Sequence, residues 1–310
     1  MRRLIADENL LRLLRLLEAE DYRFTAVTPA THARFLDRNG DAPARNLRDI
    51  FGWNLPFAPE TLPPAILETL RDADALDQSG ALLKSRLRAA SAGGRLFLHS
   101  AFPTDSADAV FFGPDTYRFK RLIAAEAPAL AHTRRIVDIG AGTGAGGIFA
   151  ARLLPNARLT LTDINASALA LAAVNARHAG IDAELVEGSA LDAVEGEIDL
   201  IVANPPYIMD ADARSYRDGG GLHGAALSLE WALAGARRLS PGGTMILYTG
   251  IAIVQGRDEF RKKLEEQLPA LGATLRYEEL DPDIFGEELE EPAYRDVERI
   301  AAVGAIIRRS

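Results

Sequence analysis

The spacing of hydrophobic positions divides the chain into two unlike halves. In the first half, leucines at positions 10, 11, 13, 14, 16 and 17 follow the helical repeat and give one wide apolar face. Prolines interrupt the pattern later, although proline is tolerated in the first turn of a helix. The predicted helices of this half cover Glu8–Glu20, Thr31–Arg38, Ala44–Ile50 and a segment from Pro63 or Pro64 to about Ala75.

The period then changes from helical to alternating. Leu82–Arg88 and Arg95–His99 alternate, and Ser91–Gly94 between them is typical of a turn. A helical segment followed by a two-stranded hairpin is similar to a winged-helix unit. The hairpin carries Lys84, Arg86, Arg88 and Arg95, which fits either a docking wing for nucleic acid or protein or, as we favour, a solvated strand face.

The second half alternates short β-branched strands with helices, which predicts βαβ units around a buried parallel sheet. The last two strands have no crossover helix between them, so they are expected to form an antiparallel edge pair. The predicted strands are 135–139, 158–162, 183–187, 198–203, 244–249, 273–280 and 298–308. The predicted helices run from the glycine-rich segment to about Leu154 and over 167–178, 225–238 and 255–267.

These patterns predict an α/β fold. Its core is a doubly wound, mostly parallel seven-stranded sheet with an antiparallel edge pair, preceded by a mainly helical domain with a β-hairpin. We place the N-terminal domain at residues 1–110, with a role in substrate recognition, and the sheet domain at residues 111–310.

Composition sets limits on this picture. The chain has 310 residues, 48% hydrophobic and 25% charged, as in ordinary globular proteins. It has no cysteine, which excludes disulfides, thiolate metal sites and a cysteine nucleophile, and we predict no metal site. No apolar run approaches the roughly 20 residues of a membrane span, and arginines interrupt Met1–Leu17, unlike a secretory signal. We therefore expect a cytoplasmic protein with no membrane partner.

The net charge of −9 argues against a general attraction to nucleic acid. Residues 1–110 hold 14 basic and 15 acidic side chains, so most of the excess lies in the second half. The strongest acidic cluster is Asp281–Asp296, with seven acids and one base. If this segment faces a ligand site, it would repel a phosphate backbone; a solvated loop that points away is almost equally compatible with the sequence.

A glycine-rich turn is the sharpest local motif. In Val137-Asp-Ile-Gly-Ala-Gly-Thr-Gly144 a strand ends and glycines alternate before a helix begins. Glycines there allow a tight turn and a close approach of the backbone to a ligand. The helix start behind the turn offers free N–H groups, and Asp163 at the end of the next strand can accept the hydrogens of a ribose diol.

Two cofactors are compatible with this glycine-rich motif. Gly142, Gly144 and Gly147 also satisfy G-x-G-x-x-G, with Asp163 21 residues after Gly142, so a nicotinamide dinucleotide is an alternative. Asp138, however, would repel a pyrophosphate and attract the cationic amino-acid end of S-adenosylmethionine. The antiparallel edge pair and the tetrapeptide Asn204–Tyr207 also favour S-adenosylmethionine.

The tetrapeptide Asn204-Pro-Pro-Tyr207 follows a buried strand directly. An amide or aromatic amine nitrogen is a poor nucleophile because its lone pair is delocalised. The Asn204 side-chain oxygen and the Pro205 carbonyl could accept its two hydrogens and favour pyramidalisation, while proline fixes the carbonyl direction in advance. The Tyr207 ring could stack on a planar group.

Residues 110–310 resemble the class I S-adenosylmethionine-dependent methyltransferases, and most closely those that carry Asn/Asp-Pro-Pro-Tyr. In layout the chain is most similar to the release-factor glutamine methyltransferases. The resemblance implies S-adenosylmethionine as cofactor, with Asp138, Gly140 and Gly142 at its methionine part and Asp163 at its ribose. The predicted cofactor-binding residues are Asp138, Gly140, Ala141, Gly142, Gly144, Asp163, Ile164, Ser189 and Asn204, and the predicted catalytic residues are Asn204, Pro205, Pro206 and Tyr207.

Three features depart from that family and bear on the acceptor. Phe111–Tyr117 keeps a proline, an acid and a threonine but lacks the family's arginine. Ser189 stands where an acid usually meets the adenine amine, and the N-terminal half is longer.

Met209–Gly224 is a candidate substrate flap. The candidate substrate-binding residues are Phe112, Asp115, Tyr117, Arg217 and His223.

The resemblance implies transfer of a methyl group to a planar amide or amine nitrogen. A protein glutamine or asparagine side chain is the favoured acceptor and a protein the favoured partner. The alternatives are the exocyclic amine of a nucleobase in rRNA or tRNA, which the acidic charge disfavours, and a small molecule. A winged-helix regulator that binds a nucleotide without turnover is a third hypothesis, which rests on the hairpin alone.

Overall fold

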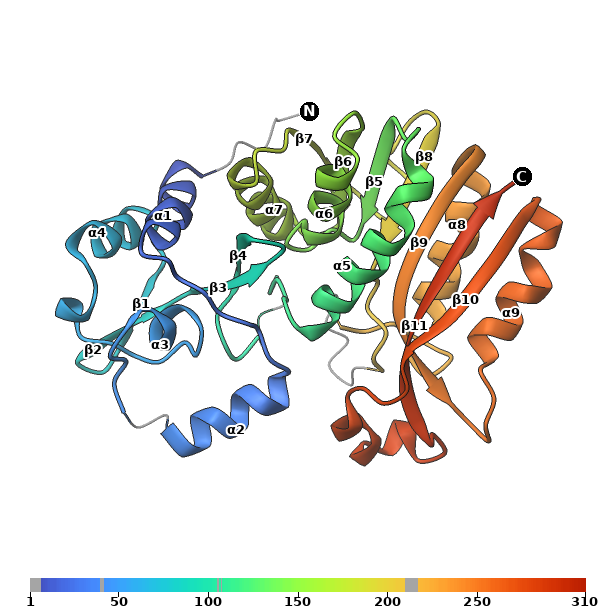
Figure 1. Ribbon diagram of the computed structural model, residues 1–310. Helices are drawn as coiled ribbons and strands as arrows, with labels where there is room; N and C mark the ends of the chain where they lie inside the picture. The colour runs from blue at the N-terminus through green and yellow to red at the C-terminus, as the bar shows by residue number, and fades with distance from the viewer. Residues whose placement is uncertain (1–6, 40–41, 105, 107, 210–216) are drawn as a thin grey trace.

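A seven-stranded sheet forms the centre of the C-terminal part in the computed structural model, which describes residues 7–39, 42–104, 106, 108–209 and 217–310 (Figure 1). Its strand order is β10-β11-β9-β8-β5-β6-β7. The strands are β5 (Arg135–Ile139), β6 (Arg158–Asp163), β7 (Ala183–Glu187), β8 (Ile198–Ala203), β9 (Leu239–Ile253), β10 (Ala273–Asp281) and β11 (Arg299–Arg309). The strands β5 to β9 pair in parallel, whereas β11 runs antiparallel to both β9 and β10. The predicted mostly parallel sheet and its antiparallel edge are confirmed.

Helices cover both faces of this sheet. The helices α5 (Pro114–Glu126), α6 (Ala145–Leu153) and α7 (Ala166–His178) pack on one face, and α8 (Ala226–Arg238) and α9 (Glu259–Gln267) on the other. In β5 the side chain of Ile136 joins the core under α5 and α6, and its neighbour Val137 joins the core under α8. Because successive strand residues point to opposite faces, both faces of β5 are apolar and buried.

Helix α5 was not predicted from the sequence. It begins at Pro114, just after Gly113, in a segment whose hydrophobic spacing predicts no helix. Helix α9 also begins later than predicted, because Asp258 caps it by accepting a hydrogen bond from the Arg261 amide at 2.8 Å. Both helix starts depend on local chemistry that hydrophobic spacing does not reveal.

The N-terminal part is mainly helical, as predicted, and lies beside the α7 end of the sheet (Figure 1). Leucines of α1 are buried together with Leu171 and Val174 of α7, so the two parts share one apolar cluster. The described elements of this part are α1 (Glu8–Ala19), α2 (Pro29–Asn39), α3 (Leu47–Phe51), α4 (Pro64–Asp72), β1 (Leu76–Ser79), β2 (Leu82–Ser85), β3 (Leu87–Ala92) and β4 (Arg95–Ser100). Short 3-10 turns cover Pro59–Thr61, Ala127–Leu130, Pro269–Leu271, Gly286–Glu290 and Pro292–Tyr294. The division at residue 110 stays a prediction.

The predicted single hairpin is two hairpins. Strand β1 pairs with β2 and β3 pairs with β4, so the expected strand Leu82–Arg88 is split at Arg86. Arg88 is buried and donates to the Ser100 carbonyl, and the Lys84 ammonium donates to the Phe102 carbonyl. Arg86 pairs with Asp74 and Asp77, and Arg95 with Glu18. Arg88 and Lys84 thus contact the protein itself, whereas Arg86 and Arg95 form ion pairs at its surface, so the solvated-face interpretation holds for these two residues only.

A buried asparagine on α7 ties the second hairpin to the glycine turn. The Asn175 side-chain oxygen accepts from the Leu98 amide at 2.9 Å, and its nitrogen donates to the Leu98 carbonyl and to the Thr143 carbonyl at 3.1 and 3.0 Å.

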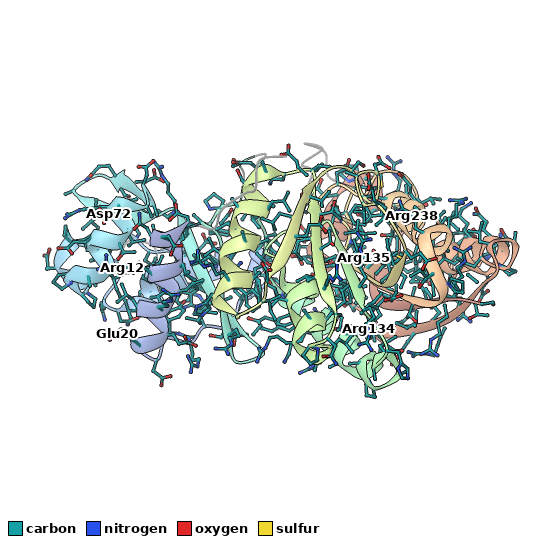
Figure 2. All side chains as sticks on the ribbon, turned by 90° about the horizontal axis from the view of Figure 1, so that it is seen from above. Arg12, Glu20, Asp72, Arg134, Arg135 and Arg238 are labelled. Carbon is teal, nitrogen blue, oxygen red and sulfur yellow. The ribbon has the colours of Figure 1, made fainter. Side chains whose placement is uncertain are left out.

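Seen from above, Arg134, Arg135 and Arg238 gather at the amino ends of the parallel strands (Figure 2). The opposite, carboxyl ends carry the candidate site.

Candidate functional site

A cavity of about 410 Å³ opens at the carboxyl ends of β5, β6 and β8. This is the position at which doubly wound sheets bind ligands, and the volume is typical of a small-molecule site. Most of the residues predicted from sequence lie on its wall. These residues are Asp115, Asp138, Gly140, Ala141, Gly142, Asp163, Ile164, Ser189, Asn204, Pro205, Pro206, Tyr207 and Arg217.

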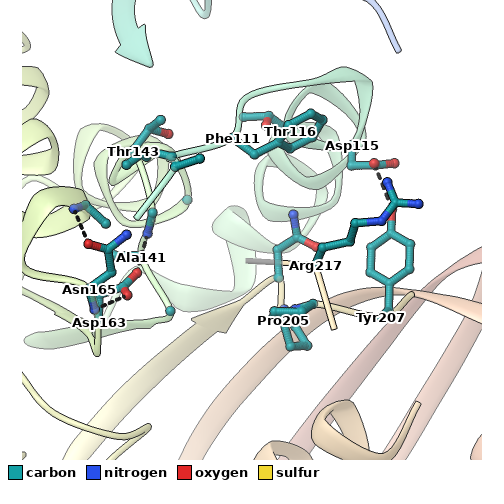
Figure 3. A pocket seen from close by; sticks show the side chains of 18 of the residues that line it. Phe111, Asp115, Thr116, Ala141, Thr143, Asp163, Asn165, Pro205, Tyr207 and Arg217 are labelled. Carbon is teal, nitrogen blue, oxygen red and sulfur yellow. Dashed lines mark hydrogen bonds between the residues drawn. The ribbon is translucent and has the colours of Figure 1, made fainter. Parts of the chain in front are cut away.

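Backbone atoms shape one end of the cavity. Gly140 and Gly142 have φ of +61° and +53°, the left-handed conformation that glycine adopts without strain. A Cβ added at Gly142 would meet no described atom within 4 Å and would project into open space. The Asp163 carboxylate orders this turn, since Oδ2 accepts from the Gly142 amide and Oδ1 from the Asn165 amide, both at 2.9 Å (Figure 3). Beside it, Ile164 exposes 59% of its surface, unusual for a large apolar residue.

Asp138 lies beneath the glycine turn. It is 2% exposed, and its Oδ2 accepts a hydrogen bond from the Gly147 amide of α6 at 2.7 Å. Burial, with a smaller contribution from the negative charge of Asp163, raises the pKa of Asp138 to about 8. A cationic ligand in the cavity would favour the ionised form, which gives this end of the site a preference for positive charge.

Asn204 ends strand β8 at the other end of the cavity. Its side-chain Oδ1 is buried and accepts no hydrogen bond from the residues that the structure describes. An unsatisfied buried acceptor costs about 1–3 kcal/mol, so buried acceptors are nearly always paired. Since Asn204 lines the cavity, a ligand N–H that reaches this oxygen would satisfy it.

The Tyr207 ring is held from behind the cavity. Its hydroxyl donates to Oδ2 of Asp115 at 2.8 Å (Figure 3). Burial first, and the charge of Asp115 second, hold the pKa of Tyr207 well above its ordinary value of 10, so the hydroxyl stays a donor. On its flank the ring abuts Gly250, where an added Cβ would lie 2.4 Å from ring carbons. The aromatic wall of the site is therefore fixed in place.

The flap and the acidic segment meet at the cavity. Arg217 lines the wall and forms an ion pair with Glu288 of the connection between β10 and β11. Phe285 of the same connection lines the cavity and packs edge-on against Tyr207 with ring centres 6.0 Å apart. The acidic segment Asp281–Asp296 therefore reaches the cavity through Phe285 on the wall and through the ion pair of Glu288 with Arg217. Residues 210–216 of the predicted flap, with Arg214, lie outside the described residues.

Four predicted residues do not line this cavity. Phe112 is buried beside His99, and the Tyr117 hydroxyl accepts from the Ala26 amide at 2.9 Å. Gly144 immediately precedes α6, and His223 lies 3.2 Å from Asp296 on the wall of a neighbouring hollow. In the described structure these four residues lie around the cavity and not on its wall.

Sequence reasoning missed several residues of the wall. Trp231 of α8 packs so closely on the turn that a Cβ on Gly140 would lie 2.5 Å from its ring. Phe111 and Phe285 frame the Asn204 end, and Pro29 and Phe102 come from the N-terminal part. No motif marks these positions, because each reaches the cavity only through tertiary packing.

The described residues include no group of three or more side chains placed to hold a metal ion. Among the same residues, no helix is both long and apolar enough to cross a membrane.

Residues 120–247 match the methyltransferase small domain family. The chain is 35% identical over 158 residues to the release factor glutamine methyltransferase of Deinococcus radiodurans, covering 50% of this chain and 55% of that protein. It is 36% identical over 176 residues to the protein of the same name from Moorella thermoacetica, covering 52% and 58%. It is 32% identical over 136 residues to the ribosomal RNA small subunit methyltransferase C of Ectopseudomonas mendocina, covering 39% and 41%.

These matches confirm the predicted class. Residues 120–247 match a methyltransferase domain, and the chain is similar in sequence to release factor glutamine methyltransferases. The chain spans about half the length of the curated relatives it matches.

Proposed function

We propose that this chain transfers a methyl group from S-adenosylmethionine to a planar, weakly nucleophilic nitrogen, with a protein glutamine or asparagine side chain as the favoured acceptor. The observation that carries the proposal is the buried Oδ1 of Asn204, which has no partner among the described residues and belongs to a side chain that lines the same cavity as the glycine turn. An amide NH₂ group would satisfy this oxygen and leave its second hydrogen for the Pro205 carbonyl.

The end of the cavity at the glycine turn, which we call the donor end, fits S-adenosylmethionine; the end at Asn204 is the acceptor end. The buried carboxyl of Asp138 suits the cationic amino-acid end, and the open space over Gly142 admits a ligand against the backbone. Asp163 would bind the ribose hydroxyls, because each of its oxygens accepts one backbone N–H and retains a free lone pair. Ile164 and Ser189 would contact the adenine.

When bound, S-adenosylmethionine supplies an electrophilic methyl group on a sulfonium sulfur. Asn204 and Pro205 would hold the two N–H hydrogens and turn the nitrogen lone pair toward that methyl. The nitrogen–carbon bond forms as the carbon–sulfur bond breaks, and the nitrogen then loses a proton to water. The residues of the tetrapeptide accept hydrogen bonds and position the amide, and no strong base is required.

Two features of the structure favour a protein over RNA as acceptor. The basic side chains of the hairpins are buried or paired within the protein, so they offer little to a phosphate backbone. The acidic segment Asp281–Asp296 reaches the cavity through Phe285 and Glu288. The N-terminal part contributes Pro29 and Phe102 to the wall, and we assign residues 1–110 to acceptor recognition.

The test is methyl transfer from labelled S-adenosylmethionine to purified bacterial release factors and, separately, to total RNA. We expect label in protein, at a glutamine or asparagine mapped by mass spectrometry, and loss of label with Asn204→Ala. Label in RNA alone would reject the protein acceptor and support a nucleobase amine in RNA as the acceptor. Donor consumption with a small-molecule extract but with neither macromolecule would support the small-molecule alternative.

A further inference from the structure

A buried carboxylate lies behind the tetrapeptide and joins two tyrosines. Asp115 of α5 is 4% exposed; its Oδ2 accepts from the Tyr207 hydroxyl at 2.8 Å, and its Oδ1 from the Tyr248 hydroxyl of β9 at 2.5 Å. Arg118 lies 3.3 Å from Oδ1 and also pairs with Asp281 at 2.7 Å. Asp115 thus connects α5 to β9 and to the segment after β8, and its neighbour Arg118 extends the contacts to Asp281 at the end of β10.

A buried carboxylate such as that of Asp115 depends on hydrogen bonds and ion pairs for its stability. Burying a charge costs a large free energy unless it is paired and hydrogen-bonded, and removing one partner leaves the other unsatisfied. Here both oxygens are occupied and a guanidinium lies beside them. Asp115 lines the cavity, but each of its oxygens already accepts from a tyrosine hydroxyl, which makes direct binding of a substrate N–H less favourable.

The contact with Asp115 removes the remaining freedom of the Tyr207 ring. Gly250 limits the ring on one flank, and Phe285 packs against it edge-on. The hydroxyl contact fixes the far end of the ring. A ring fixed at both ends also steadies Pro205 and Pro206 directly before it in the chain.

We propose that Asp115 is a positioning residue for methyl transfer: it anchors the Tyr207 hydroxyl and so keeps the aromatic wall and the adjoining acceptor carbonyl in register with the bound nitrogen. This role rests on the proposed function and differs from the direct substrate contact predicted for Asp115 from the sequence. Tyr248 and Arg118 support the same carboxylate, and Tyr207 transmits the effect.

The experiment compares Asp115→Asn, Tyr207→Phe and the double variant in the transfer assay. Asparagine keeps the shape of aspartate but has one acceptor oxygen, so it cannot accept from both tyrosines. We expect kcat to fall about 10- to 100-fold in each single variant, because small misplacements of reacting groups cost this much. The KM of the acceptor and the Kd for S-adenosylhomocysteine should stay within about twofold. The double variant should be about as slow as the slower single variant, since both changes disrupt the same Tyr207–Asp115 contact.

Tyr277→Phe is the matched control. The Tyr277 hydroxyl donates to Asp258 at 2.6 Å, a tyrosine–aspartate contact between β10 and the start of α9 that is remote from the cavity. Its loss should leave kcat unchanged. An unchanged kcat in Asp115→Asn, a raised acceptor KM at normal kcat, or multiplicative losses in the double variant would each overturn the proposal.

A second measurement does not need an acceptor. In protein labelled with 3-fluorotyrosine, the resonances of Tyr207, Tyr248 and Tyr277 are assigned by their loss in Tyr207→Phe, Tyr248→Phe and Tyr277→Phe. The resonances of Tyr207 and Tyr248 should both move in Asp115→Asn while the Tyr277 resonance stays in place. If they do not move, the positioning role is wrong even where methyl transfer is observed. If they move but wild-type protein transfers methyl to no acceptor, the contact stands and the proposed function fails.

Discussion

The two ends of the cavity are built in different ways. The donor end consists largely of one continuous stretch, from Asp138 through the glycine turn to Asp163, and its contacts are backbone atoms and carboxylates. The acceptor end gathers side chains from distant segments, with Asn204 and Tyr207 held by Asp115, Tyr248 and the acidic connection. Local sequence therefore specifies the donor end, whereas packing specifies the acceptor end.

This difference explains how one scaffold can serve different acceptors. A short stretch can keep the donor bound while the acceptor end varies through residues that no motif fixes. The relatives that the chain matches carry names of both protein- and RNA-modifying enzymes, in line with this view. Changes at one end should accordingly leave binding at the other end intact, and the following predictions test that separation.

The largest effect is expected at the acceptor end. Asn204→Ala should lower kcat by about 10²- to 10³-fold, the usual loss for one preorganised hydrogen-bonding group at a reaction centre. Asn204 is also a predicted cofactor contact, but because it lies at the acceptor end the affinity for S-adenosylhomocysteine, measured by calorimetry, should fall much less than kcat. Asn204→Asp keeps acceptor oxygens and should retain more activity than the alanine variant. Equal loss of activity and of donor affinity in Asn204→Ala would mean that the two ends are not separate.

The donor end should respond to a single added methyl group. Gly142→Ala places a Cβ in the open cavity at a left-handed φ, so we expect donor affinity to fall about tenfold. Gly180→Ala is the matched control, because Gly180 also has a left-handed φ, of +76°, and open space around it. Both variants should lose about 1–2 kcal/mol of stability from backbone strain, measured by thermal unfolding. Equal donor affinity in both variants would place the donor elsewhere.

Asp138 should make donor binding depend on pH. Since its folded pKa is about 8, the affinity for the cationic donor should rise between pH 7 and 9, and Asp138→Asn should bind weakly with a flat profile. The stability effect has the opposite direction. The folded state retains this proton to about pH 8 while the unfolded chain releases it near 3.8, so stability is lost as pH rises between these values. The melting temperature of wild type should fall more steeply over this window than that of Asp138→Asn.

The smallest effect is expected on the hairpins. Arg86→Glu and Arg95→Glu replace largely exposed ion-pair partners, so each should change stability by about 0.5 kcal/mol or less and leave methyl transfer unchanged. Arg88 is unsuitable for this test because it is buried. A clear loss of transfer to RNA in either variant would restore the docking-wing hypothesis and weaken the preference for a protein acceptor.

Much of the fold could be predicted because hydrophobic spacing reports on burial. The central strands β5 and β8 have the predicted bounds, since a strand covered on both faces is a short apolar run between polar turns, and the edge strand β7 also has its predicted bounds. Helix α5 was not predicted because the sequence of its first turn, Gly113 followed by Pro114, is typical of a loop. The split of Leu82–Arg88 into two strands also escaped notice, because alternation continues across the break at Arg86.

The sequence by itself determined the donor end: a strand, a turn that only glycine tolerates and an acid one strand later must come together, because parallel strands end at the same edge of the sheet. It also determined that Asn204 follows a buried strand at that edge. Only the tertiary structure decided that Asp115 lies behind Tyr207 and that the acidic connection reaches the cavity. It also decided that Arg88 is buried. These contacts join residues dozens of positions apart, and their geometry depends on how helices pack on the sheet, which no local pattern specifies.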